Sequence, residues 1–366
     1  MKRTATLFVF ASLLAACATA DVGRSPAPLP QTTAPSPRAD FLKLIDRPKV
    51  DVNVKLQTPA VTGTLEQTAF SFDAEKGQTV PGILLKAANS TGKRPVVIYL
   101  HGTGGKKEDG LPLMRNMANR GFLGVSIDGR YHGARAAAFP KEGNMNAYET
   151  AIFHTWKIVV DDQLPPGEKK QHPLYYDTVW DIMRLIDYLQ TRDDVDAAHI
   201  GLYGVSKGGI EAYLAAAVDT RIAACVPCIS VESFKWAVDN NQWKARVETF
   251  QKAFDAAAKE AGITTPDGKF VSDFYQRVMP GIDGEFDGPS MVPLIAPRAL
   301  MAINGEKDPR TQPPSLKLAT DAAQAAYKAA GAEDRFVIMI QPNTPHQVKP
   351  DAQRAGEDFL AKWLKP

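Results

Sequence analysis

A serine set between glycines is the first candidate for chemistry. Residues 199–217 read HIGLYGVSKGGIEAYLAAA, so Ser206 stands two residues after Gly204 and two residues before Gly208. The residues before the serine predict a strand, and those after it predict a helix. A tight turn at such a junction needs small neighbours and exposes the hydroxyl at a helix N-terminus, where the helix dipole favours negative charge. Ser206 is therefore a candidate nucleophile.

A serine nucleophile needs a histidine base, and the base needs an acid that orients it. His346 is the only one of the six histidines that follows Ser206, and it lies between the last predicted strand and the last predicted helix. Asp308, in the loop NGEKDPRTQP after another predicted strand, is the expected acid. The carboxylates that compete with it are Glu306 in the same loop and Asp283, Glu285 and Asp287 further upstream.

A glycine-rich turn, LHGTGG at 100–105, follows the predicted strand 94–100. Turns of this kind supply backbone N–H groups to an oxyanion hole, and we expect Thr103 and Lys207 to be the donors, with Gly102 as the turn glycine. His101 and His132 are interpreted as residues that orient turns, although His132 could line the site.

The elements that must position these residues alternate along the chain. Strands are predicted at 94–102, 122–128, 199–206, 221–230, 297–305 and 335–342, and helices at 113–121, 177–190, 207–218, 315–330 and 351–365. Asp177 is the expected N-cap of the second helix. Residues 69–74 and 80–88 predict an antiparallel pair of strands. This order predicts an α/β fold with a mostly parallel sheet and helices on both faces.

Two insertions interrupt the alternation, at 134–173 and 231–290. The second is too long for a plain connection and carries helical spacing, so we expect a helical cap over the mouth of the site. Its aromatic residues are numerous enough to wall a pocket. Trp156, Trp236 and Trp243 are interpreted as core residues, which would bind a ring by stacking if they faced the pocket.

The N-terminus predicts export. Lys2 and Arg3 precede an apolar run at 4–16 that is too short to span a bilayer, and the run ends in LLAAC, which resembles the bacterial lipoprotein box. We expect a signal peptide at 1–16, a lipidated Cys17 with a proline-rich tether at 17–40, and the folded domain at 41–366. The protein would then be lipid-anchored in the periplasm or at the outer membrane. The alternative is a plain secretory signal and a soluble product.

Composition excludes several other functions. The 366 residues carry a formal charge of +2 and no basic stripe, which argues against nucleic acid. No metal or cofactor is expected, because clustered Cys/His ligands, a phosphate loop and a dinucleotide fingerprint are missing from the sequence. Cys225 and Cys228 lie three residues apart in a predicted strand, about 10 Å from each other, too far for a disulfide. They are expected to be buried thiols.

The chain resembles the α/β-hydrolase superfamily over about 69–366, and within it the branch of dienelactone hydrolases, acetyl xylan esterases and prolyl-oligopeptidase-like enzymes. The resemblance is carried by HGTGG, DGRYHGAR at 128–135, GVSKGG, GEKDP and His346. Departures are Tyr131-His132 inside the turn, Lys207 after the serine, and a serine where dienelactone hydrolases use cysteine.

The resemblance implies a serine esterase that acts on a small-molecule or carbohydrate ester through Ser206, His346 and Asp308, with the oligomeric state open. One alternative is an oligopeptidase, which the 68 residues before the fold do not favour because they are too few for a propeller domain. The other alternative is an inactive, tethered binding lipoprotein.

Overall fold

The folded unit begins earlier than the sequence predicts. The computed structural model describes Met1 and residues 36–159, 164 and 169–365, so residues 2–16 of the signal peptide, Cys17 and most of the tether lie outside the described residues. Helix α1 (Pro37–Ile45) buries Phe41 completely. Arg38 donates from Nε to the Ala217 carbonyl at 2.8 Å. The predicted end of the tether at residue 40 is therefore wrong, because α1 packs on the domain.

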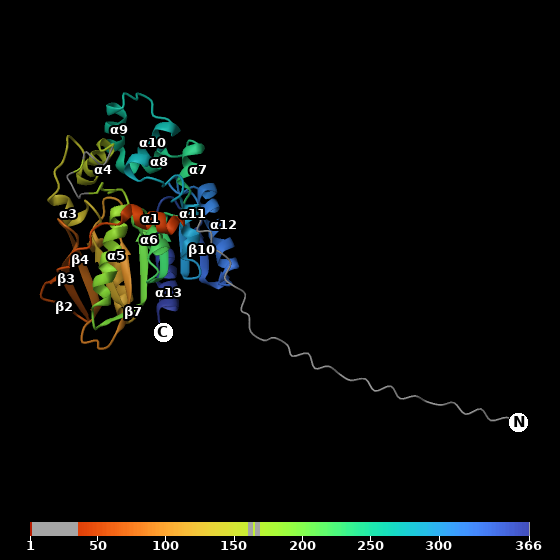
Figure 1. Cartoon of the computed structure of the whole chain (residues 1–366). Coiled ribbons are helices and arrows are strands. Elements are labelled where there is room, and N and C mark those ends of the chain that lie inside the picture. Colours follow the sequence, from red (N-terminus) through yellow and green to blue (C-terminus); the bar gives the residue numbers. More distant parts are fainter. Residues whose placement is uncertain (2–35, 160–163, 165–168, 366) are drawn as a thin grey trace. The chain divides into compact units, whose positions relative to one another are not determined.

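A single sheet forms the centre of the domain (Figure 1). Its strands are β1 (Lys55–Leu56), β2 (Ala60–Thr62), β3 (Leu65–Glu75), β4 (Gln78–Ala87), β5 (Arg94–Leu100), β6 (Leu123–Ile127), β7 (Val195–Val205), β8 (Ile222–Cys228), β9 (Ala299–Gly305) and β10 (Phe336–Gln341). The order is β1-β3-β4-β6-β5-β7-β8-β9-β10, with β2 paired to β3. From β6 to β10 all pairs are parallel, and the pairs among β1 to β4 and β4 with β6 are antiparallel. The predicted mostly parallel sheet is confirmed.

Strand β5 shows why its sequence is a continuous apolar run. It lies between β6 and β7 and is covered on both faces. Val96 and Ile98 enter one hydrophobic core, whereas Val97 enters the other. Successive side chains of a strand point to opposite faces, so a strand buried on both faces needs apolar residues at every position.

Helices cover both faces, as expected. Helices α1, α5 (Tyr176–Gln190), α6 (Lys207–Val218) and α12 (Pro313–Ala329) contribute to the larger core, and α13 (Pro350–Leu364) packs on the opposite face. Helix α2 (Leu111–Asn119) packs on β6 and β4. The short elements are η1 (Lys107–Gly110), α3 (Gly133–Ala137), η4 (Val292–Ile295) and η5 (Glu333–Arg335). None of the helices in the described part of the chain combines the length and the apolar composition needed to cross a membrane.

The predicted N-cap of α5 is wrong by two residues. Tyr175 occupies the cap position, and Asp177 lies in the first turn of the helix. The Asp177 carboxylate accepts the backbone N–H of His172 at 2.9 Å and a guanidinium N–H of Arg47 at 2.6 Å. The Asp177 carboxylate thus bonds a neighbouring loop residue and the distant Arg47 and does not cap the helix.

The 231–290 insertion is helical, as predicted. It contains α7 (Phe234–Asp239), α8 (Lys244–Val247), η3 (Glu248–Phe250), α9 (Gln251–Glu260), α10 (Gly268–Val278) and α11 (Gly288–Met291). Helices α9 and α10 contact α4 (Ala147–Lys157) of the first insertion. In Figure 1 these three helices and α7 gather at the end of the domain far from the C-terminus.

Most aromatic residues of the insertion form its own core rather than a pocket wall. Phe274 stacks on Phe250 at 5.8 Å and on Trp156 of α4 at 5.7 Å between ring centroids. Trp243 is buried beside Phe254, with ring centroids 5.9 Å apart. Trp156 and Trp243 are therefore core residues, and these rings hold the two insertions together. Of the three tryptophans, Trp236 alone is half-buried.

The two cysteines of β8 are free, buried thiols, as predicted. Burial raises the pKa of the Cys228 thiol to about 12, and burial also raises that of Cys225. Neither thiol is ionised at neutral pH, so neither is a nucleophile.

A buried ionic network fixes the turn at 128–135. Arg130 is fully buried and donates two hydrogen bonds of 2.9 Å to the Asp181 carboxylate on α5. Arg135 donates to the same carboxylate at 2.7 Å, and Glu75 lies 2.6 Å from Arg130. The turn that follows β6 is thereby attached to α5 and β3.

Replacing Arg130 by methionine is expected to lower the free energy of unfolding by about 3–5 kcal/mol, because the buried carboxylates lose a partner. Urea denaturation followed by circular dichroism measures the change. Lys269→Gln, which removes an exposed pair with Asp273, is the control and should leave the unfolding midpoint unchanged. A loss below about 1 kcal/mol for Arg130→Met would contradict the role assigned to the network.

Candidate active site

Ser206 occupies a strained turn between β7 and α6. Its φ is +55° and its ψ is −115°, a conformation that costs a residue other than glycine about 1–3 kcal/mol. A Cβ atom at Gly204 would lie 2.1 Å from the Gly208 carbonyl oxygen, and one at Gly208 would lie 2.2 Å from the Leu100 oxygen. Both glycines are therefore required by close approach of backbone to backbone.

The structure brings together the three residues that the sequence predicts as nucleophile, base and acid. The Ser206 hydroxyl lies 2.7 Å from Nε2 of His346. Nδ1 of His346 lies 2.8 and 2.9 Å from the two carboxylate oxygens of Asp308. The carboxylate accepts, so Nδ1 carries the proton and Nε2 is free to accept from the serine. Ser206, Asp308 and His346 follow β7, β9 and β10, and the carboxyl ends of these parallel strands meet at one edge of the sheet.

The Asp308 carboxylate is fully buried and is held by its own loop. Its Oδ1 accepts the backbone N–H groups of Arg310 at 2.9 Å and Thr311 at 3.2 Å. The competing carboxylates have other partners. Glu306 accepts the Asn343 N–H, and Glu285 lines a separate cavity. Asp283 accepts hydrogen bonds from Ser272 and Gln276, and Asp287 accepts them from Ser233 and Phe234. Asp308 is the carboxylate that reaches His346.

Burial lowers the pKa of His346 below its ordinary value, although the Asp308 carboxylate opposes this shift. Arg246 and Arg310 also lower the pKa of His346 by electrostatic repulsion. The imidazole is therefore neutral at neutral pH, which is the form that can accept a proton.

The glycine-rich turn lies against the serine. A Cβ atom at Gly102 would be 3.6 Å from the Ser206 Cβ, and the Gly105 N–H closes the turn on the Gly102 carbonyl at 3.0 Å. Lys207 is the first residue of α6, so its N–H has no partner within the helix. Within the described part of the chain, neither the Thr103 N–H nor the Lys207 N–H donates a hydrogen bond to a protein group.

The side chain of Lys207 forms a buried ion pair that sequence reasoning missed. The side chain is 1% exposed and pairs with the Glu211 carboxylate one helical turn later. Its ammonium also lies 5.8 Å from the ring centroid of Tyr148. The spacing of Lys207 and Glu211 along α6 is a signal that could have revealed the pair. Nδ1 of the nearby, buried His132 donates to the Arg130 carbonyl at 2.8 Å, which agrees with a turn-orienting role.

A second missed ion pair lies within the insertion, and its arginine also contacts the loop that carries Asp308. Arg246 of α8 is buried, pairs with Glu232, and donates to the Thr311 hydroxyl at 3.3 Å. Arg310 donates from Nε to the Ala245 carbonyl at 3.0 Å. Burial raises the pKa of Glu232 to about 7. No sequence pattern links these residues, because the partners come from separate elements.

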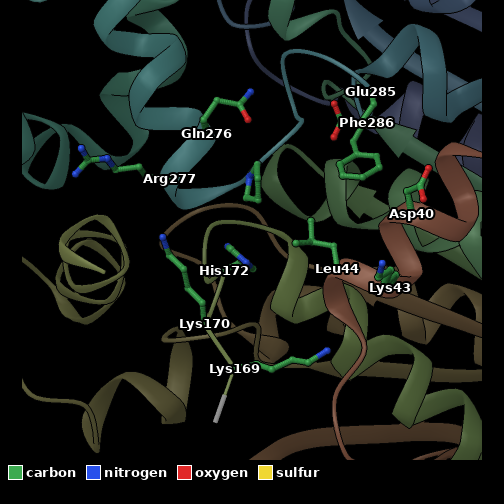
Figure 2. A pocket seen from close by; sticks show the side chains of 11 residues that line it. Asp40, Lys43, Leu44, Lys169, Lys170, His172, Gln276, Arg277, Glu285 and Phe286 are labelled. Carbon is green, nitrogen blue, oxygen red and sulfur yellow. The ribbon is translucent and has the colours of Figure 1, made fainter. Parts of the chain in front are cut away.

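A cavity of about 550 Å³ lies elsewhere, between α1, α10 and the segment that precedes α5 (Figure 2). Its lining includes Lys43, Lys170, Arg277 and Phe286, and it contains none of Ser206, Asp308 and His346. It is therefore distinct from the candidate site. In the described residues, no group of three or more His, Cys, Asp or Glu side chains is arranged to hold a metal ion.

The sheet order and the helices on its two faces define the fold of an α/β hydrolase. Residues 167–331 match a family model described as glucuronyl esterase of fungi. The chain is 22% identical over 303 residues to the Bacillus subtilis protein YtaP, whose name describes a hydrolase. This match covers 80% of the present chain and 86% of YtaP. It is also 29% identical over 190 residues to a 4-O-methyl-glucuronoyl methylesterase of Hypocrea jecorina. That match covers 50% of the present chain and 39% of the methylesterase.

Solved structures share the fold. An acetyl xylan esterase from Paenibacillus sp. R4 superposes with a TM-score of 0.60 at 19% identity, over 89% of this chain and 93% of that one. A glucuronoyl esterase from Solibacter usitatus gives a TM-score of 0.60 at 15% identity, over 90% and 92%. The chain therefore has the fold of the α/β hydrolases, and it is a carboxylic ester hydrolase like the esterases that it resembles. The expected fold and enzyme class are confirmed.

We expect His346 to titrate below pH 6.5 in the folded protein, because burial disfavours the imidazolium. Nitrogen-15 NMR of labelled histidines measures this, with His346→Asn assigning the signal. Arg310→Gln should raise the pKa of His346, since it removes a cation that lowers it. Lys307→Gln in the same loop is the matched control. A His346 pKa above 6.5 in the wild type would show that Asp308, rather than burial, dominates.

Proposed function

We propose that the enzyme cleaves its ester through a covalent acyl intermediate on Ser206. The Ser206 oxygen attacks the ester carbonyl carbon while Nε2 of His346 takes the hydroxyl proton, and the proton then passes to the departing alcohol. Water, deprotonated by His346, attacks the acyl group, and the carboxylic acid leaves as Ser206 regains its proton. Asp308 holds the imidazole in the required tautomer, and the N–H groups of Thr103 and Lys207 stabilise the oxyanion. The unbroken chain of hydrogen bonds from Ser206 to Asp308 is the observation that supports this most.

We further propose that the ester is borne by a carbohydrate, either as an acyl group on a sugar hydroxyl or as the ester of a uronic acid. Relatives named for acetyl xylan and for glucuronoyl esters support this class. Arg310, a half-buried arginine close to His346, offers a positive charge that suits an acidic sugar or an acid product, whereas the charge of Arg246 is already paired with Glu232.

Ser206→Ala is expected to lower kcat for p-nitrophenyl acetate by at least about 10⁴-fold, and Asp308→Asn by about 10⁴-fold, because nucleophile and base orientation are lost. The Ser206→Ala/Asp308→Asn double variant should be no worse than Ser206→Ala, since the residues act as a unit. Glu306→Gln, in the same loop as Asp308, is the matched control and should retain activity. Folded Ser206→Ala with wild-type turnover would refute the mechanism.

A substrate panel separates the remaining readings. Acetylated xylo-oligosaccharides, the methyl ester of glucuronic acid and peptide p-nitroanilides are compared by kcat/KM. A carbohydrate ester hydrolase turns over at least one of the first two and leaves the anilide intact. Preference for the peptide would support the oligopeptidase reading, and inactivity towards all three, with no p-nitrophenyl ester turnover, would support a binding protein.

We also propose that the protein is exported and anchored by a lipid on Cys17. The basic start at Lys2 and Arg3 and the LLAAC sequence support this. In a bacterial host the full-length protein should partition with membranes, and Cys17→Ser should block processing or release the protein. Wild-type protein found wholly in the soluble fraction, with an unmodified N-terminus by mass spectrometry, would contradict anchoring.

A further inference from the structure

We propose that His101 is a positioning residue, which holds the Gly102–Thr103 peptide so that the Thr103 N–H keeps a fixed direction beside Ser206. The inference rests on the proposed function, because it assigns to the Thr103 N–H the oxyanion role described above. His101 touches no reacting atom in this account and acts through the backbone alone.

Two backbone contacts fix the tautomer of His101. Nδ1 lies 2.8 Å from the Gly102 carbonyl oxygen, which can only accept, so Nδ1 carries the proton. Nε2 lies 3.0 Å from the backbone N of Gly129, which donates, so Nε2 is unprotonated. The ring is 2% exposed and therefore has no solvent alternative to these two partners.

The geometry of the peptide carries the effect from the carbonyl to the N–H. In a trans peptide the C=O of Gly102 and the N–H of Thr103 lie in one plane and point in opposite directions. The Gly102 oxygen is held by both His101 Nδ1 and the Gly105 N–H, at 2.8 and 3.0 Å. Because the peptide is planar, these two hydrogen bonds to the Gly102 oxygen also fix the direction of the Thr103 N–H. The turn that contains this peptide lies against the Ser206 side chain.

A buried cation keeps His101 from changing its state. The Lys207 ammonium lies against Gly129, 2.9 Å from where a Cβ atom of that residue would stand. Burial first, and then the Lys207 charge, lower the pKa of His101 to about 4. Protonation of Nε2 would also place its N–H against the Gly129 N–H, and two donors that face each other repel. The neutral form with the proton on Nδ1 therefore persists at neutral pH.

Two isosteric variants separate the proposal from a purely structural role. In His101→Asn the amide nitrogen takes the place of Nδ1 and can still donate to Gly102, whereas in His101→Gln the amide oxygen takes the place of Nε2 and can still accept from Gly129. We expect His101→Gln to lose about 10²–10³-fold in kcat for p-nitrophenyl acetate with KM changed less than about 3-fold, the loss known for one oxyanion donor. His101→Asn should stay within about 10-fold of the wild type.

Equal losses in the two variants, or a larger loss in His101→Asn, would overturn the proposal. If His101→Gln does not fold, nitrogen-15 NMR of the wild type still tests it: a signal for the Nε2–H tautomer, or titration of His101 above pH 6, would contradict the arrangement. Failure of the proposed function is recognised separately, because Ser206→Ala would then retain activity whatever the His101 variants do.

Discussion

One crowded crossing, where the start of α6 passes over the end of β5, holds the site together. The backbone of Gly208 approaches the Leu100 carbonyl so closely that no side chain fits between them. At the same crossing Ser206 has a positive φ, and the turn after β5 lies against the serine. The strained nucleophile and the N–H groups beside it thus share one crowded stretch of backbone, and interactions elsewhere in the fold must offset the strain.

Two buried ion pairs lie close to the site. Lys207 pairs with Glu211 on α6, the helix that begins directly after Ser206. Arg246 pairs with Glu232 beside the loop that carries Asp308. Buried ion pairs contribute little net stability, yet losing one partner is costly, so such pairs restrict the geometries that the surrounding backbone can adopt. The second pair, together with the Thr311 hydroxyl, couples the position of the insertion to the acid loop.

Local pattern predicted the sheet, most of the helices and the three residues of the hydrogen-bonded chain, because each depends on periodicity or on chain order after Ser206. The same reasoning failed where a distant partner decides. Asp177 looks like a helix cap, but Arg47 holds it in the first turn. The start of α1 looks like tether, but Phe41 is buried in the core. The number of aromatic residues in the insertion suggests a pocket wall, but most of them form a core with Trp156, for which a core position is expected. Which side chains meet across 100 residues is set by the assembled fold, which periodicity does not encode.

The central claim is that Ser206 is the nucleophile, and covalent labelling tests it most directly. A fluorophosphonate reacts with an activated serine and leaves a stable adduct on its oxygen. Peptide mapping by mass spectrometry should find one stoichiometric adduct on Ser206, with the adduct and turnover lost together in His346→Ala. An active enzyme that carries the adduct on a different residue, or that keeps full turnover after Ser206 is fully modified, would contradict the account.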